Sequence, residues 1–209
     1  LHVRSRRQRQ MCIRDSNDPV HLGGAIDAEA ADKAARFLKL CDAHGLPVLS
    51  LCDTPGFMVG PDAEQTATVR RFSRLFVTGS HLRVPMVAVV LRKAYGLGAQ
   101  AMAGGHLHAP AATVAWPTGE LGPMGLEGAV RLGFRRELEA AGGPDEQQAL
   151  FDSLLAEAHR RARGTSAAGV FELDDVIDPA ETRRWIIAAL AGRGGEREPG
   201  PAPRYVDPW

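Results

Sequence analysis

The glycine-rich turn after the most apolar run of the chain is the segment best suited to chemistry. Residues 86–91 are continuously apolar, which predicts a strand buried on both faces. Gly96 and Gly98 follow, and residues 99–103 favour a helix. A strand, a glycine turn and a helix in this order present unpaired backbone N–H groups to a ligand. Such groups favour negative charge, whether on a phosphate, an enolate or a ureido oxygen.

Two alternative roles for these glycines stay open. Gly96, Gly98 and Ala101 match the dinucleotide pattern G-x-G-x-x-G/A, and Glu120 lies about twenty residues further on. However, residues 92–95 separate the predicted strand from the first glycine, and Glu120 follows residues that predict a turn. Close backbone packing is the second alternative. We favour an oxyanion-type site over both.

The elements around this turn alternate between strand and helix, which predicts an α/β layer of parallel strands joined by right-handed crossovers. Asp27 is the expected N-cap of a helix that ends at Gly45, and residues 48–52 are a buried strand. A helix with an Asp62–Gln65 capping box is expected to stop at Gly79, and a strand is expected at 113–116. Residues 119–128 are too glycine-rich for an ordinary helix. After them we expect a helix opened by Pro144, an extended pair at 176–177, and a last helix with Asp178 as cap and Pro179 in its first position.

The composition predicts one folded domain with ragged ends. Of the 209 residues 44% are hydrophobic, which is enough for one core. Residues 1–16 are rich in arginine and poor in apolar side chains. We expect them to be disordered or artefactual, with a transit peptide or a nucleic-acid arm as alternatives. Residues 17–192 are the expected domain and residues 193–209 a mobile tail.

Charge and cysteine usage exclude several partner classes. Lys plus Arg and Asp plus Glu number 25 each, so no electrostatic case exists for nucleic acid or an anionic membrane. No apolar run approaches the roughly 18 residues of a membrane span. Three cysteines without a C-x-x-C pair are typical of a reducing compartment, so we expect a cytoplasmic location.

Several polar residues outside the turn have weaker claims to chemistry. Glu120 and Glu127 could be the two carboxylates of a hydratase, although surface glutamates are more often solvated or paired. His106-x-His108 lacks a recognisable third ligand, so no metal site is predicted. Asp53 ends a buried strand, where it could brace the turn at Pro55–Gly56. Arg92 and Lys93 could attract a carboxylate or a phosphate, or pair with acids.

Several independent motifs, in order and spacing, resemble one family. The sequence is similar to the carboxyltransferase (beta) subunit of biotin-dependent acyl-CoA carboxylases, such as propionyl-CoA carboxylase, from about His21 to Leu190. That family has two crotonase-like domains in tandem, and this chain looks like the second. The resemblance implies an α/β crotonase-like (Clp protease/crotonase) fold of repeated strand-strand-helix units. The motifs are Asp53–Phe57, Arg92–Gly96, Ala115–Pro117, Met124–Gly125, and Ile177–Pro179 with Thr182–Arg183.

The resemblance implies that CO2 moves from carboxybiotin, on a carrier protein, to the α-carbon of an acyl-CoA. In such proteins the second domain supplies a backbone N–H pair for the biotin ureido oxygen. The first domain of a neighbouring subunit supplies the pair for the acyl-CoA. The implied partners are a biotin carboxylase and biotin carrier subunit and that neighbouring domain, in a homo-oligomer. Carried onto this chain, the donors are the N–H groups of Leu97 and Gly98, and the residues around the cofactor are Tyr95, Gly96, Pro55, Gly56 and Phe57.

The chain departs from the family pattern at two positions. The family usually reads A-Y-G-G-A-Y-D-x-M, whereas residues 94–102 read AYGLGAQAM. A shift of the donor pair by one residue, to Gly98 and Ala99, stays open. Gln100 replaces an aspartate often found near the acyl chain, so we expect a substrate that is not simply propionyl-CoA.

Three alternative functions stay open. They are a biotin-dependent decarboxylase, a non-catalytic assembly subunit, and an enoyl-CoA hydratase using Glu120 and Glu127. Because the resemblance places the CoA half of the site on another domain, we expect the isolated chain to have little or no transfer activity.

Overall fold

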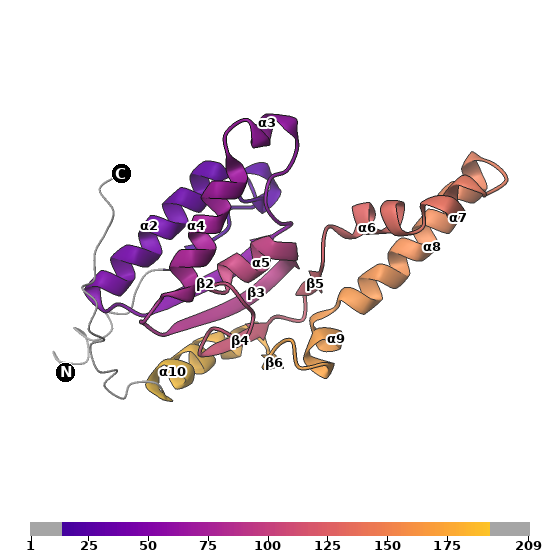
Figure 1. Ribbon diagram of the computed structural model, residues 1–209. Helices are drawn as coiled ribbons and strands as arrows, with labels where there is room; N and C mark the ends of the chain where they lie inside the picture. The colour runs from indigo at the N-terminus through magenta and orange to yellow at the C-terminus, as the bar shows by residue number, and fades with distance from the viewer. Residues whose placement is uncertain (1–13, 193–209) are drawn as a thin grey trace.

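The protein is built on one parallel β-sheet (Figure 1). The computed structural model describes residues 14–192; residues 1–13 of the leader expected at 1–16, and the tail expected at 193–209, lie outside the described residues. The strand order is β1-β2-β3-β4-β6, and β5 pairs with the last residues of β3, all in parallel. This confirms the predicted α/β layer of parallel strands. The strands are β1 (Arg14–Ser16), β2 (Val48–Thr54), β3 (Met86–Tyr95), β4 (Ala112–Ala115), β5 (Glu120–Gly122) and β6 (Asp175–Val176).

Strand β3 is central because helices cover both of its faces. Met86 packs with the side chains of α2 and α4, whereas Val87 and Val89 pack with those of α10 on the opposite face. Figure 1 shows α2 and α4 side by side over one face and α10 beneath the other. The apolar run therefore lacks alternation, as expected for a strand buried on both faces. The helices packed around the sheet are α2 (Ala28–His44), α4 (Thr68–Ser80), α5 (Gly96–Met102) and α10 (Thr182–Gly192).

The ends of α2 follow the predicted capping chemistry. An oxygen of Asp27 accepts a hydrogen bond from the N–H of Ala30 at 2.8 Å. Gly45 ends the helix in the left-handed conformation, with φ of +67°. Cys41 and Cys52 are both buried free thiols, and burial raises the pKa of the Cys52 thiol to about 12, with the charge of Asp53 adding to the effect. They pack as small hydrophobic residues, as predicted.

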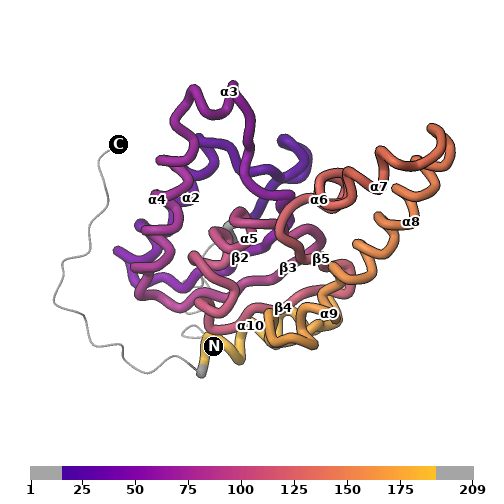
Figure 2. Tube along the Cα trace, turned by 45° about the vertical axis from the view of Figure 1, so that its right-hand side comes forward, coloured from indigo at the N-terminus to yellow at the C-terminus, as the bar shows by residue number. Residues whose placement is uncertain are grey.

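A helical arm projects from the sheet on the side of β5 (Figures 1 and 2). Its outer part is held by a cluster that includes Val130, Leu138 and Phe151. At its root, Leu126 packs on Tyr95, the last residue of β3. The arm is therefore in direct contact with the strand end that leads into α5. It consists of α6 (Leu126–Gly133), α7 (Arg135–Glu139) and α8 (Pro144–Ala162), the last opened by proline as predicted.

The structure corrects three predicted elements. Strand β3 runs to Tyr95, so residues 92–95 do not separate it from the glycine turn. The expected helix from Asp62 is two helices, because Ala67 adopts a left-handed conformation with φ of +54° between them. The stretch 119–128 is not irregular, since it contains β5 and the first turn of α6, with Gly128 inside the helix. The remaining short helices are η1 (Leu22–Gly24), α3 (Pro61–Glu64), α9 (Gly164–Gly169) and η2 (Pro179–Glu181).

The sheet also begins before residue 17, where the sequence places the start of the domain. Residues 14–16 form the edge strand β1, whose partner is β2 in the register Arg14↔Leu49. That short edge pairing lay hidden in a segment whose composition resembles a disordered leader. Within residues 14–192, no helix combines the length and the apolar content that crossing a membrane would need.

Candidate active site

The turn that follows β2 is closed by the side chain of Thr54 and by the backbone of Ile26, which follows η1. Thr54 Oγ1 accepts a hydrogen bond from the N–H of Gly56 at 3.1 Å and donates to the carbonyl oxygen of the same residue at 3.2 Å. Gly56 has φ of +124°, a backbone conformation that L side chains rarely adopt. Ile26 donates to the Gly56 carbonyl at 3.0 Å and accepts from the N–H of Met58 at 2.8 Å. The turn is thus fixed on both sides.

The turn that follows β3 packs directly against it. Gly96 has φ of +59° and opens α5. A Cβ atom on Gly96 would lie 2.8 Å from the carbonyl oxygen of Pro123, and one on Gly98 would lie 2.8 Å from the Cα atom of Gly56. Close backbone packing therefore accounts for both glycines without any ligand. The two turns form one unit at the carboxyl ends of β2 and β3, where open α/β sheets bind ligands.

The start of α5 leaves backbone donors without acceptors, among them the N–H groups of Leu97 and Gly98. Leu97 and Gly98 lie in the first turn of α5, where an N–H group has no intrahelical partner. Within residues 14–192, no group accepts a hydrogen bond from either N–H. Leu97 is 61% exposed, whereas Gly98 and Ala99 are buried. The leucine side chain, which departs from the family pattern, therefore leaves the backbone donors in place.

The aromatic rings expected near the cofactor are engaged in the fold. The ring of Phe57 stacks on that of Phe72 with centroids 4.0 Å apart. Tyr95 is buried, and its ring packs at the root of the arm. Both residues reach the turn through their backbone, not their rings. Pro55 and Gln100 are half-buried, and the side chain of Gln100 has no hydrogen-bond partner among the described residues.

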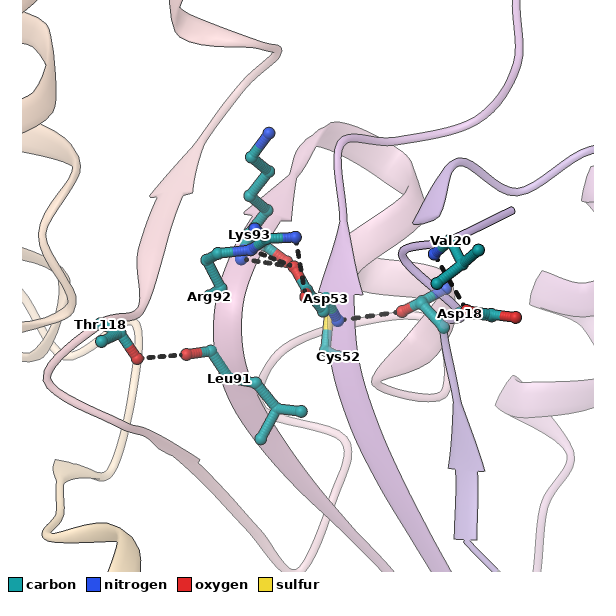
Figure 3. A network of polar contacts seen from close by, with 9 residues as sticks. Asp18, Val20, Cys52, Asp53, Leu91, Arg92, Lys93 and Thr118 are labelled. Carbon is teal, nitrogen blue, oxygen red and sulfur yellow. Dashed lines mark hydrogen bonds and ion pairs between the residues drawn. The ribbon is translucent and has the colours of Figure 1, made fainter. Parts of the chain in front are cut away.

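Asp53 braces the strand ends (Figure 3). One of its oxygens accepts hydrogen bonds from Nε of Arg92 and from the backbone N–H of Lys93, each at 3.2 Å. Its own N–H donates to Oδ1 of Asn17 at 3.0 Å. Figure 3 shows the ammonium group of Lys93 pointing away from Asp53. Of the two roles left open for Asp53, bracing of the turn is the one that these contacts support.

Glu120 lies in β5, not in a surface loop, and both of its oxygens are bonded. Oε2 accepts from the Tyr95 hydroxyl at 2.6 Å, and Oε1 accepts from Nδ1 of His159 at 2.9 Å. Burial alone would raise the pKa of Glu120, but these two hydrogen bonds, together with the charges of His159 and Lys93, hold it below its ordinary value. Burial and the Glu120 carboxylate raise the pKa of Tyr95 well above its ordinary range. A neutral tyrosine thus donates to an ionised glutamate.

His159 was missed by the sequence reasoning because no local pattern connects it with the turn. It lies 39 residues after Glu120, on α8. Glu127, the expected second carboxylate of a hydratase, is exposed on α6. The rings of His106 and His108 have centroids 5.1 Å apart, and no group of three metal-ligating residues occurs in the described part of the chain.

The fold and the site together define a class: an α/β domain with two glycine turns packed at the carboxyl ends of parallel strands and unpaired N–H groups between them. The carboxyl transferase domain family matches residues 10–200. The chain belongs to this family.

Three relatives illustrate the similarity. The biotin-dependent acetyl-/propionyl-coenzyme A carboxylase beta6 subunit of Mycobacterium tuberculosis is 42% identical over 178 residues, covering 84% of this chain and 37% of that protein. A single-chain, multi-domain long-chain acyl-CoA carboxylase is 61% identical with a TM-score of 0.77, over 84% of this chain and 17% of that one. The hexameric transcarboxylase 12S, solved with methylmalonyl-coenzyme A bound, is 36% identical with a TM-score of 0.79, over 93% of this chain and 37% of that one.

These similarities confirm the expected family and the crotonase-like fold. Within that fold, β4, β5 and α6 follow one another along the chain, and β5 pairs with β3. The chain spans little more than a third of the length of the curated relatives it matches.

Proposed function

We propose that this chain is the second half of a carboxyltransferase that moves CO2 from carboxybiotin to the α-carbon of an acyl-CoA. The observation that carries the proposal is the pair of unpaired N–H groups at Leu97 and Gly98, where the two glycine turns meet. Membership of the carboxyl transferase family and the similarity to biotin-dependent acyl-CoA carboxylase subunits support it.

The donor set suits the chemistry that biotin requires. Carboxybiotin, when bound, supplies the CO2 and is left with negative charge on its ureido oxygen. Backbone N–H groups that are already fixed stabilise such charge without reorganising during the reaction. Here the backbone of Gly56 packs under Gly98 and the carbonyl of Pro123 packs against Gly96. The donors are therefore held rigidly, and water exclusion is left to the ligand and the partner domain.

Burial favours one of the two donor registers. Leu97 is exposed, so a ligand oxygen can approach its N–H from solvent. Ala99 is 3% exposed and lies deeper in the helix. We therefore assign the pair to Leu97 and Gly98, not to Gly98 and Ala99. Gly96, Pro55 and Gly56 form the backbone wall beside this pair, and Lys93 is the nearby cation on β3 whose ammonium group points away from Asp53.

The rest of the enzyme is part of the proposal. The first domain of a neighbouring subunit supplies the acyl-CoA donors, and a biotin carboxylase and carrier subunit present the cofactor, in a cytoplasmic homo-oligomer. Gln100, close to the donor pair on α5, points to an acyl-CoA that is not simply propionyl-CoA. The same site serves a decarboxylase that runs the transfer backwards. Hydration by Glu120 and Glu127 gains no support, because Glu120 is bonded to Tyr95 and His159.

The first test is complementation. The chain is mixed with a separately expressed first domain of such an enzyme, and transfer from methylmalonyl-CoA or malonyl-CoA to free biotin is measured. We expect activity in the mixture and little or none from the chain alone. Absence of transfer activity in a mixture in which both pieces are folded and associated would favour a non-catalytic assembly subunit.

The second test removes a single donor. Replacing Leu97 by its α-hydroxy acid analogue turns the amide into an ester, which deletes the N–H and keeps the side chain. We expect the rate to fall by about 10²- to 10³-fold. Leu97→Ala, which keeps the N–H and trims an exposed side chain, is the matched control and should stay near the parent rate. An ester variant with the parent rate would refute the assignment of this donor.

A further inference from the structure

A chain of three side chains connects the helical arm to the candidate donor turn. Tyr95 on β3 donates to Glu120 on β5, which in turn accepts from His159 on α8. The Glu120 side chain is 25% exposed and that of His159 is 44% exposed, so the chain runs from solvent to a buried hydroxyl. Three elements that are distant in sequence are thus joined through one carboxylate.

Tyr95 is the residue from which the donor turn departs. It is the last residue of β3 and the N-cap position of α5. Its carbonyl oxygen would lie 3.6 Å from a Cβ atom on Gly56, and its ring edge would lie 3.6 Å from one on Gly122. Its backbone therefore touches one glycine turn while its ring touches β5. Because Tyr95 is the N-cap position of α5, a rotation of its backbone would move the start of that helix.

Apart from its backbone packing against Gly56 and Pro123, the turn has no side chain of its own that fixes its direction. No side chain caps the N-terminus of α5. Gly96 and Gly98 carry no side chains, and Leu97 is exposed. The orientation of the turn is set by backbone packing and by what fixes Tyr95. A hydrogen bond to an ionised carboxylate is among the stronger contacts available for that purpose.

We propose that Glu120 is a positioning residue for the donor pair: it holds the Tyr95 hydroxyl from β5, and His159 holds Glu120 from the arm, so the N–H groups of Leu97 and Gly98 keep one direction. The structural part of this inference stands on the network itself. Its consequence for turnover rests on the proposed function.

The test measures the direction of the two N–H bonds. Backbone ¹⁵N relaxation on the 209-residue chain gives order parameters for Leu97 and Gly98. We expect order parameters of about 0.85 in the parent protein and below about 0.6 in Tyr95→Phe and in Glu120→Ala. Glu120→Gln, which keeps an acceptor for the Tyr95 hydroxyl, should retain the parent values. The double variant of Tyr95→Phe and Glu120→Ala should be no worse than either single variant.

A matched control separates positioning from general loosening. Leu154 packs in the outer cluster of the arm, away from Tyr95. Leu154→Ala should lower stability yet leave the two order parameters unchanged. Equal loss of order in Leu154→Ala, or unchanged order in Tyr95→Phe, would overturn the inference.

Kinetics then connect the network to the reaction. In the complementation assay we expect Tyr95→Phe and Glu120→Ala each to lower kcat roughly tenfold with KM unchanged. Glu120→Gln, which keeps the acceptor, should retain most of the parent kcat. Loss of N–H order with kcat unchanged would confirm the positioning and refute the proposed role of the donors. Parent-like order with a lower kcat would overturn the positioning and leave the proposed function intact.

Discussion

A single methyl group at position 98 tests whether the two glycine turns are packed as closely as described. In Gly98→Ala the new Cβ would lie 2.8 Å from Cα and 2.9 Å from the carbonyl carbon of Gly56, and 3.2 Å from the nitrogen of Phe57. These neighbours are backbone atoms, and Gly56 is held by hydrogen bonds from Ile26 and Thr54. Overpacking of this kind costs about 1–3 kcal/mol, against a gain of up to about 1 kcal/mol in helix propensity. We expect a net loss of about 1–2 kcal/mol.

Gly128→Ala is the matched control, because Gly128 also lies inside a helix. Its Cβ would meet only the terminal methyl of Met124, at 3.3 Å, and that flexible side chain can move. Here the propensity gain should dominate, and stability should rise by about 0.5–1 kcal/mol. Urea denaturation of both variants with the parent chain gives the two signs directly. A Gly98→Ala protein as stable as Gly128→Ala would refute the close contact between the turns.

The same contact limits what substitutions of Gly98 can reveal about function. A larger residue there would displace Gly56 together with the donor pair, so a loss of transfer would follow from packing alone. Such a substitution would therefore not separate the oxyanion site from the packing of the two turns. The structure shows that it would also strain the fold. The ester at Leu97 avoids this difficulty because it changes no packing volume.

Three further substitutions test polar groups in the fold. Ser50 is 1% exposed and its hydroxyl has no hydrogen-bond partner within the described chain, so Ser50→Ala should stabilise the protein by about 1 kcal/mol in thermal unfolding. Thr113→Val, which removes a hydroxyl that donates to the Leu107 carbonyl oxygen at 2.6 Å, should instead destabilise the protein by a similar amount. A Thr113→Val protein more stable than Ser50→Ala would refute the assignment of one hydroxyl as bonded and the other as unpaired. Glu120→Gln should cost about 1 kcal/mol at neutral pH, the difference between charged and neutral hydrogen bonds. Because the folded-state pKa of Glu120 is lowered, the stability that its carboxylate contributes is present above the ordinary pKa of 4.5 and is lost as pH falls through the folded-state pKa. The free energies of unfolding of the parent and of Glu120→Gln, plotted against pH, should therefore converge in acid. Parallel curves would refute this.

Local signals in the sequence predicted the elements whose causes are local. Asp27 and Gly45 mark the ends of α2 because capping depends on a few neighbouring residues. Long-range pairing was not visible. The polar residues Arg92 and Lys93 hid the last part of β3, because that part is paired with β5, a strand distant in sequence, and no local pattern reveals such a pairing. The left-handed Ala67 that divides α3 from α4 also has no signature in residue type.

For the candidate site as well, the sequence shows the local features and not the distant partners. Glycines and backbone donors at 96–98 follow from the strand-turn-helix order, which is local. The partners of these residues are not local: Gly56 meets Gly98, Pro123 meets Gly96, and His159 reaches Glu120 from the arm. Phe57 belongs to a motif that predicts a cofactor neighbour, which stays a prediction, and its partly buried ring stacks on that of Phe72. A motif records which residues recur, and it does not separate those that pack from those that face a ligand.

Backbone-to-backbone contact also accounts for the unusual leucine in the turn. Gly96 and Gly98 lie against the backbone atoms of Pro123 and Gly56, so their positions admit no side chain. Leu97, between them, is 61% exposed and meets no such limit. A change of the side chain at position 97 therefore leaves the backbone N–H groups of the turn in place. Under the proposed function, such a change alters the surface that the ligand meets and keeps the donor pair.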